Sequence, residues 1–294
     1  MYTIQNSELS VTVSPVGAEL QSVRDVRSAT EYLWQGDSRW WSGRSPILFP
    51  IVGGLWNGTC RLGDTTMQLA KHGFVRRRPW RMVEHEAQRV RFELVGTVGD
   101  YAVYPFAFSL SVTYRVEGRK VLADFEVRNL GGSELYFQLG GHPALNLPGW
   151  CDEDPVDGYL QLEGSAESVV RVGEQGCWLP ERHAVPREAD GLVPLSVDTF
   201  AHEALIFDQG QVSAATLLDK RRRPVARVES SAPVWLFWSP QGVHTPFVCC
   251  EPWYGLCDAV GFEGSLPQRP YMQCAPAGGS WQGGFSIEVL DAAQ

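Results

Sequence analysis

Phe106-Ala-Phe-Ser-Leu-Ser-Val-Thr-Tyr-Arg-Val-Glu117, followed after Gly118 by Val121-Leu-Ala-Asp-Phe-Glu-Val-Arg128, is the stretch that decides the fold. In the first run the apolar side chains stand at the even positions, and in the second they stand at the odd positions. Strict alternation places every second side chain on the same face of a strand. Two such runs around a glycine-containing turn predict a long antiparallel hairpin with one buried face.

Shorter alternating runs recur along the chain and are separated by turn clusters such as Asn57-Gly58 and Gly131-Gly132. No segment keeps a helical period between two helix caps. We therefore predict an all-β, antiparallel sandwich or barrel in which residues 1–294 form a single domain. The Pro- and charge-rich segment 172–202 is expected to be a long surface excursion. The remaining strands are predicted at 8–14, 18–26, 80–86, 89–95, 134–139, 157–163, 211–218, 224–230, 234–238, 246–251 and 282–290.

The composition excludes several classes of protein. With 25 basic and 34 acidic residues the net charge is −9, which makes nucleic acid and anionic membranes poor partners. No stretch approaches the roughly 20 apolar residues of a membrane span, and the first residues do not resemble a secretory signal. The seven cysteines contain no Cys-x-x-Cys pair, so neither a disulfide framework nor a zinc motif is indicated. We expect a reduced, cytoplasmic protein.

Three short polar segments lie in apolar or glycine-rich surroundings, at residues 71–76, 139–146 and 247–255. Glu251 follows four largely apolar residues, so we expect it in a buried strand, where burial raises a carboxyl pKa toward the range useful for proton transfer. The alternative is a structural carboxylate held by an arginine or by backbone amides, and the residues alone leave both open. For His72 or His142 taken singly, a hydrogen-bonded structural histidine is the more frequent case.

Two histidines and a glutamate are also a possible zinc ligand set. No two of them stand at a helix-turn spacing, however, and we predict no metal site. Nucleophile-elbow, phosphate-loop and dinucleotide glycine motifs are missing from the sequence as well. We therefore predict no cofactor.

Taken together, these segments resemble the aldose 1-epimerase (galactose mutarotase-like) superfamily, and most closely its LacX-type bacterial branch. Four motifs follow one another in the order of that branch over nearly the whole chain, and Asp258 follows the last of them. They are Arg44-Ser-Pro-Ile-Leu-Phe-Pro-Ile-Val-Gly53, His72-Gly-Phe-Val-Arg76, Gly140-Gly-His-Pro-Ala-Leu-Asn146 and Glu251-Pro-Trp-Tyr-Gly255.

The resemblance implies a β-supersandwich and a cofactor-free interconversion of the α and β anomers of an aldose. It implies that Glu251 is the general base, His142 the general acid and His72 a substrate-binding, transition-state-stabilising partner. A bell-shaped activity profile between about pH 5 and 8 is then expected. The implied substrate-binding residues are Arg44, Arg76, Asn146 and Trp253, together with Glu203 or Asp208.

Three questions stay open at this point. Gly54 stands where the branch commonly has an arginine, and Arg44 or Arg76 would have to replace that donor. A hexose-6-phosphate epimerase, which needs arginines converging on a phosphate, is the first alternative. A carbohydrate-binding protein of the same fold without turnover is the second. The expected partner in every case is a monosaccharide, of unknown identity, and the oligomeric state is unknown.

Overall fold

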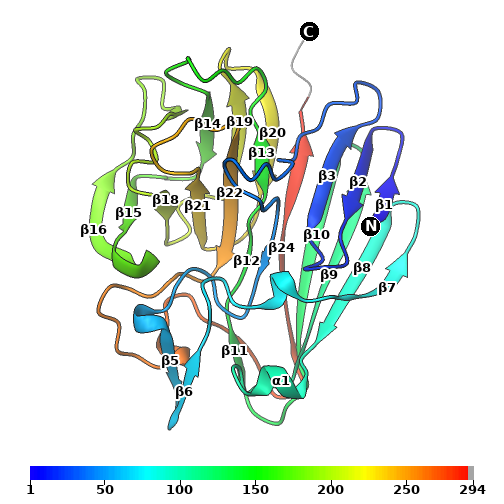
Figure 1. Cartoon of the computed structure of the whole chain (residues 1–294), viewed down its shortest axis with the longest axis vertical. Coiled ribbons are helices and arrows are strands. Elements are labelled where there is room, and N and C mark those ends of the chain that lie inside the picture. Colours follow the sequence, from blue (N-terminus) through cyan, green and yellow to red (C-terminus); the bar gives the residue numbers. More distant parts are fainter. Residues whose placement is uncertain (291–294) are drawn as a thin grey trace.

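The hairpin predicted from the sequence lies in the middle of a large antiparallel sheet. The computed structural model describes residues 1–290 (Figure 1). Strands β9 (Phe108–Glu117) and β10 (Lys120–Asn129) pair with Lys120 opposite Glu117. Gly118 and Arg119 are left as a two-residue turn, and Gly118 has a positive φ of 57°. Such a turn matches the twist of the two strands.

The nine-stranded sheet that contains this hairpin is antiparallel throughout the described residues. Its order is β17 (Val193–Leu195), β14 (Gly158–Glu163), β19 (Ala214–Asp219), β20 (Pro224–Glu229), β24 (Ser280–Val289), β10, β9, β8 (Arg89–Val95) and β7 (Arg81–His85).

A second sheet of eight strands carries the candidate site residues described below. Its order is β16 (Trp178–Ala184), β15 (Ser168–Val172), β18 (Ala204–Phe207), β21 (Val234–Trp238), β22 (Phe247–Tyr254), β12 (Leu139–Gly141) and β4 (Ile47–Leu48), with β13 (Ala144–Asn146) also paired to β22.

Smaller elements complete the described part of the chain. One helical turn, α1 (Val98–Tyr101), and the hairpin of β5 (Thr59–Leu62) and β6 (Thr65–Gln68) lie at the end of the molecule opposite the C-terminal end of β24 (Figure 1). None of the helices in residues 1–290 is long and apolar enough to cross a membrane. The small sheets are β1 (Tyr2–Gln5), β2 (Leu9–Val13) and β3 (Leu20–Asp25); β5 (Thr59–Leu62) and β6 (Thr65–Gln68); and β11 (Leu135–Phe137) and β23 (Gln273–Ala275). The 3₁₀ turns are Trp56–Gly58, Val75–Arg77, Glu174–Gly176 and Leu266–Gln268.

Strand β22 separates the main core from the functional face. All eight of its residues are buried, which fits a strand covered on both faces. Val248 and Cys250 belong to the large core shared with the nine-stranded sheet. Phe247 and Cys249 face the other way, into a separate aromatic cluster, and Trp253 packs in a third. Glu251 stands in the same alternation as Phe247, Cys249 and Trp253, so its side chain leaves β22 on the same outward face.

The structure confirms the all-β antiparallel class and the strands predicted from alternation. The segment 172–202 is not the irregular excursion that we expected. It contains β16, which forms the edge of the eight-stranded sheet, and β17, which forms the edge of the nine-stranded one. In β16 most side chains are exposed or half-buried, so an edge strand of this kind shows no alternation of apolar and polar residues.

Candidate active site

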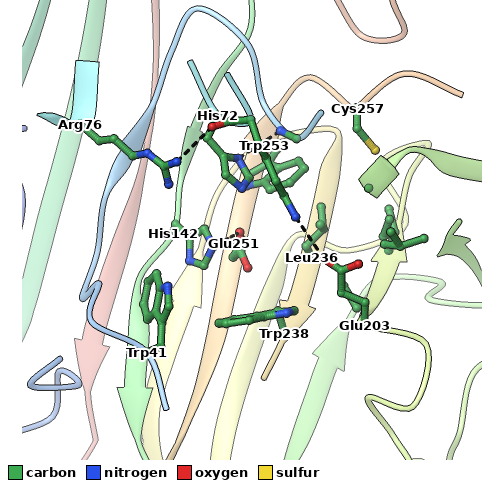
Figure 2. A pocket seen from close by; sticks show the side chains of 16 residues that line it. Trp41, His72, Arg76, His142, Glu203, Leu236, Trp238, Glu251, Trp253 and Cys257 are labelled. Carbon is green, nitrogen blue, oxygen red and sulfur yellow. Dashed lines mark hydrogen bonds and ion pairs between the residues drawn. The ribbon is translucent and has the colours of Figure 1, made fainter. Parts of the chain in front are cut away.

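A cavity of about 250 Å³ opens on the outward face of the eight-stranded sheet. Strands β18, β21 and β22 form its floor, and the loops around residues 53 and 71–76 cover one side. Figure 2 shows the titratable side chains in its middle and aromatic rings below them. The lining residues are Trp41, Gly53, Lys71, His72, Arg76, His142, Val172, Gly176, Glu203, Ala204, Ile206, Leu236, Trp238, Glu251, Trp253 and Cys257.

Strand register sets His142 opposite Glu251. Gly140 pairs with Trp253, and Ala144 pairs with Cys249. Halfway between these two pairs, His142 faces Glu251 on the same side of the sheet, where directly opposed residues have neighbouring Cβ atoms. The His142 Nε2 atom lies 3.1 Å from the Glu251 Oε2 atom. Both side chains are almost completely buried, at 9% and 2% exposure.

Burial controls the protonation of this pair. It raises the pKa of Glu251 well above its usual value and lowers the pKa of His142 well below its usual value, because a buried group is less stable when it carries a charge. A proton that moves from one group to the other leaves the net charge of the pair unchanged. The pair can therefore hold one proton in either place and titrates as a unit.

His72 contributes a hydrogen-bond donor to the same cavity. Its Nδ1 atom accepts the Gly53 N–H at 3.1 Å, and its backbone N–H donates to the Gly53 carbonyl at 2.9 Å. Burial lowers the pKa of His72, so the ring is neutral. A neutral imidazole that accepts at Nδ1 carries its hydrogen at Nε2. The His72 ring centroid lies 5.8 Å from that of His142 and 5.6 Å from that of Trp253.

The basic residues Lys71 and Arg76 lie along one side of the cavity opening. Lys71 Nζ forms an ion pair with Glu203 Oε1 at 3.1 Å, and both side chains are partly exposed (Figure 2). Arg76 donates from Nη2 to the Lys71 carbonyl at 3.1 Å. Its Nε–H is buried without a partner among residues 1–290. Arg76 and Glu203, two of the predicted binding residues, therefore do line the cavity.

Aromatic rings supply the flat walls. Trp41 stacks on His142 with ring centroids 4.8 Å apart and an interplanar angle of 23°. Trp238 meets the His142 ring edge-on at 5.9 Å and the Trp41 ring at 5.6 Å. Trp253, which the motif predicted, lines the cavity beside Glu251. The sequence did not lead us to predict Trp238 as a site residue. Trp238 nevertheless alternates along β21 with Val234 and Leu236, so the three side chains lie on one face of the strand.

Three predicted binding residues are not brought to the cavity. The Arg44 guanidinium donates to the Gln21 carbonyl at 2.8 Å and to Gln35. The Asn146 side chain donates to two backbone carbonyls, those of Glu31 and Leu33. Asp208 is buried in a bidentate pair with Arg182, at 2.8 and 3.0 Å, and accepts from the Tyr271 hydroxyl. These three side chains are bonded to other segments and do not line the cavity, so the expectation that they lie in the site is not met, and their binding of a sugar stays a prediction.

Gly54 lies under the 3₁₀ turn Glu174–Gly176. A Cβ atom at this position would lie 2.9 Å from the Gln175 carbonyl oxygen, so a side chain there requires the turn to move. The guanidinium of Arg269 reaches the Gly54 carbonyl at 3.4 Å, but it is buried against Asp258 outside the cavity. Of the two arginines considered as substitutes for the missing donor, only Arg76 lines the cavity.

The residues that could hold a metal ion differ from those considered in the sequence. In the described part of the chain, His142, Cys249 and Glu251 place one ligand atom each within 4.8 Å of the others. This set contains the thiol of Cys249 in place of the ring of His72. The expectation that the protein uses no metal or other cofactor remains a prediction.

Comparison with known proteins agrees with the geometry. The family model of aldose 1-epimerase matches residues 1–267. The chromosomal LacX protein of Lactococcus lactis subsp. lactis is 30% identical over 277 residues, which cover 91% of this chain and 92% of that protein.

Two solved structures are similar over nearly their full length. A galactose mutarotase related enzyme from Lactobacillus acidophilus has a TM-score of 0.90 at 29% identity and covers 100% of this chain and 98% of its own. A galactose mutarotase-like protein from Lactobacillus casei has a TM-score of 0.91 at 26% identity, with 99% and 100% covered. The chain therefore belongs to the aldose 1-epimerase family, with a galactose mutarotase-like β-sandwich and an epimerase-like role on sugars.

Proposed function

We propose that the protein interconverts the α and β anomers of an aldose by acid–base ring opening and reclosure. The observation that carries this proposal is the buried contact between His142 and Glu251 at the floor of a cavity of monosaccharide size. A structural histidine or glutamate would be expected to have its polar atoms satisfied. Here His142 Nδ1 has no hydrogen-bond partner within residues 1–290, and Glu251 Oε2 has no partner there beyond its 3.1 Å contact with His142 Nε2.

The chemistry needs one acceptor and one donor of protons. Glu251, as a carboxylate, removes the proton of the C1 hydroxyl, while His142, as an imidazolium, protonates the ring oxygen. The bond between C1 and the ring oxygen breaks, and an open-chain aldehyde results. After rotation about C1–C2 the two groups act in reverse, and the ring closes to the other anomer. Each positioned proton transfer contributes typically about 10²–10⁴-fold in rate.

The other cavity residues bind and orient the sugar in this proposal. The Nε2–H of His72 donates to an oxygen of the reacting end and stabilises the charge that develops there. Arg76 donates its unpaired Nε–H to a hydroxyl group. The rings of Trp41, Trp238 and Trp253 contact the apolar C–H faces of the sugar. Anomer exchange moves protons without net oxidation or reduction, so we propose that no hydride carrier, metal or other cofactor takes part.

A hexose 6-phosphate is the second candidate substrate. Lys71 and Arg76 at the opening favour it, because a phosphate is bound best by several cationic donors. Glu203 opposes it, since its carboxylate already pairs with Lys71 and would repel the phosphate. We therefore propose a neutral aldose as the first choice.

Freshly dissolved single anomers of several aldoses, each free and 6-phosphorylated, test the proposal. Polarimetry or NMR exchange measures how fast each solution reaches anomeric equilibrium. We expect acceleration by the protein, a loss of about 10²–10⁴-fold in the Glu251→Gln and His142→Gln variants, and no change in Glu263→Gln, an exposed glutamate outside the cavity.

Two results would contradict the proposal. If Glu251→Gln equilibrates the anomers as fast as the unmodified protein, the assigned base is wrong. If sugars bind, with a measurable dissociation constant, but no sugar equilibrates faster, the protein is a carbohydrate-binding protein of this fold.

A further inference from the structure

The thiol of Cys249 lies beside the proposed acid–base pair, and the reaction above does not use it. Cys249 and Glu251 stand two positions apart on β22, so their side chains leave the strand on the same face. Cys249 packs with Trp34, Ala144 and Phe247 beneath the cavity and is fully buried. His142, from the neighbouring strand pair, completes a cluster of one thiol, one imidazole and one carboxyl group.

The three groups have the spacing of an incomplete tetrahedral site. One ring nitrogen of His142, the Sγ atom of Cys249 and one carboxylate oxygen of Glu251 all lie within 4.8 Å of one another. In a zinc site with bonds of about 2.0–2.3 Å, neighbouring ligand atoms are roughly 3.3–3.7 Å apart. The Nε2–Oε2 separation of 3.1 Å is already close to that, and the thiol needs a shift of about an ångström.

Within the described residues, one buried atom of this cluster, His142 Nδ1, has no hydrogen-bond partner. Glu251 Oε2 has no partner there beyond its 3.1 Å contact with His142 Nε2. Both side chains line the cavity, so an ion can enter from the sugar side, and its fourth ligand position faces the opening. A dication that replaces the thiol proton and the one proton shared by His142 and Glu251 leaves the charge of the buried site unchanged.

We propose that His142, Cys249 and Glu251 form an inhibitory binding site for a thiophilic divalent cation, with Zn²⁺ as its natural probe. Imidazole, thiolate and carboxylate ligands suit Zn²⁺ and exclude the harder Mg²⁺ and Ca²⁺. The ion occupies the two atoms that would transfer protons, so it competes with the sugar. His142 Nδ1 has no hydrogen-bond partner within residues 1–290, and an imidazole without such support is a weaker metal ligand, so we expect the ion to exchange reversibly.

Cobalt provides a direct readout that does not depend on catalysis. Co²⁺ takes the place of Zn²⁺ in tetrahedral sites, and a thiolate bound to it absorbs in the near ultraviolet. The measurement uses the Cys151→Ser, Cys274→Ser double variant, because these two thiols are exposed and would bind cobalt at the surface. We expect a saturable thiolate band that Zn²⁺ abolishes by displacement and that an excess of a bound sugar weakens.

Cys250 provides the matched control. It is the next residue of the same strand and equally buried, but it faces the core between the sheets. Cys249→Ala and Cys249→Ser should remove the thiolate band and weaken Zn²⁺ binding by at least about tenfold, since even outer-shell changes cost that much. Cys250→Ala should retain both. Circular dichroism identifies any variant that fails to fold, and the serine variant keeps the volume of the site.

The outcomes separate this inference from the proposed function. A thiolate band that survives Cys249→Ala and Cys249→Ser, or no band at all, overturns the inference, whatever the enzyme does with sugars. A band that depends on Cys249 supports it even if no sugar is equilibrated. Where anomer exchange is measurable, Zn²⁺ should inhibit it competitively with the sugar, and Mg²⁺ at the same concentration should have no effect.

Discussion

At the scale of single residues, the proposed chemistry depends on burial. Glu251 and His142 are ordinary acid and base groups, and the surrounding Trp41, Trp238 and Trp253 remove water from them. Burial moves their two pKa values in opposite directions, and the contact at 3.1 Å lets one proton serve both groups. The same groups on the surface would transfer protons to water and would provide no such coupling.

The first prediction concerns the pH profile of anomer exchange. The active form holds one proton on the pair, so the acid limb reports the uptake of a second proton and the alkaline limb the loss of the shared one. The lowered pKa of His142 moves the first limb to lower pH, and the raised pKa of Glu251 moves the second to higher pH. We expect kcat/KM to stay level across the neutral range and to fall only outside it, so the profile is broader than the bell between about pH 5 and 8 that the resemblance implied. A steep change in kcat/KM between pH 6 and 7 would show that burial does not set these limbs.

A second prediction at this scale concerns stability. Because the pKa of Glu251 is raised in the folded protein, the carboxyl group favours folding below its usual value of 4.5, and that contribution is lost as the pH rises through the folded pKa. Glu251→Gln cannot ionise. The melting temperature of this variant should therefore exceed that of the unmodified protein at pH 9, and the difference should shrink toward pH 5. An equal difference at both pH values would contradict the raised pKa.

At the scale of the elements, the register between β22 and the strands β12 and β13 assembles the pair. Gly140 and Gly141 bring β12 close to its neighbours before His142. A Cβ atom at Gly141 would lie 2.5 Å from a ring carbon of Phe285, on β24 of the other sheet. Gly141, which lies in this contact between the two sheets, directly precedes His142, the proposed acid.

Gly141→Ala tests this contact. We expect a loss of about 1–3 kcal/mol in the free energy of unfolding, as is typical of overpacking, together with a lower kcat. Phe285→Leu makes room for the methyl group, so in the double variant the two losses should be less than additive. Denaturant titrations of the four proteins measure this. Strict additivity would mean that the Phe285 ring is not what excludes the side chain.

How well the sequence predicts an element depends on whether one face of that element is buried and the other is exposed to solvent. The hairpin of β9 and β10 was predictable because one face is buried and the other is not. The edge strand β16 was not, because solvent covers much of it and no alternation marks it.

The same holds for the site residues. His72, His142, Glu251, Arg76 and Trp253 reach the cavity as the motifs suggested, and so does Glu203, one of the two alternatives for the acid. Arg44 and Asn146 were assigned to it because they stand in two of the motifs, and Asp208 because the resemblance implied an acid at Glu203 or Asp208. Their bonds to carbonyls and to Arg182 depend on distant segments, which a local motif cannot reveal.

At the scale of the whole molecule, a buried ion pair anchors the loop beside the cavity. Arg269 Nε donates to Asp258 Oδ1 at 2.6 Å, and both side chains are at most 1% exposed. The second oxygen of Asp258 accepts the Trp56 backbone N–H at 3.0 Å. This pair joins segments more than 200 residues apart in the chain and holds the turn that follows Gly54.

Asp258→Asn leaves the Arg269 charge buried without compensation. We expect the free energy of unfolding to fall by about 3–5 kcal/mol, which urea titration measures. Asp37→Asn, which breaks the solvent-exposed pair with Arg39, is the control and should leave stability unchanged. A small loss in Asp258→Asn would indicate that water reaches Arg269 in the folded state.

The full burial of β22 has a consequence for how this chain can diverge. A single inserted or deleted residue between Phe247 and Tyr254 would rotate Glu251 into the core and bring a neighbour into its place, so this strand tolerates no change of length. Lys71 and Glu203, at the opening, come from connecting segments that can lengthen without such a penalty. Substitutions and insertions at the rim can therefore change which ligand the cavity accepts, while the proposed acid–base pair below keeps its position.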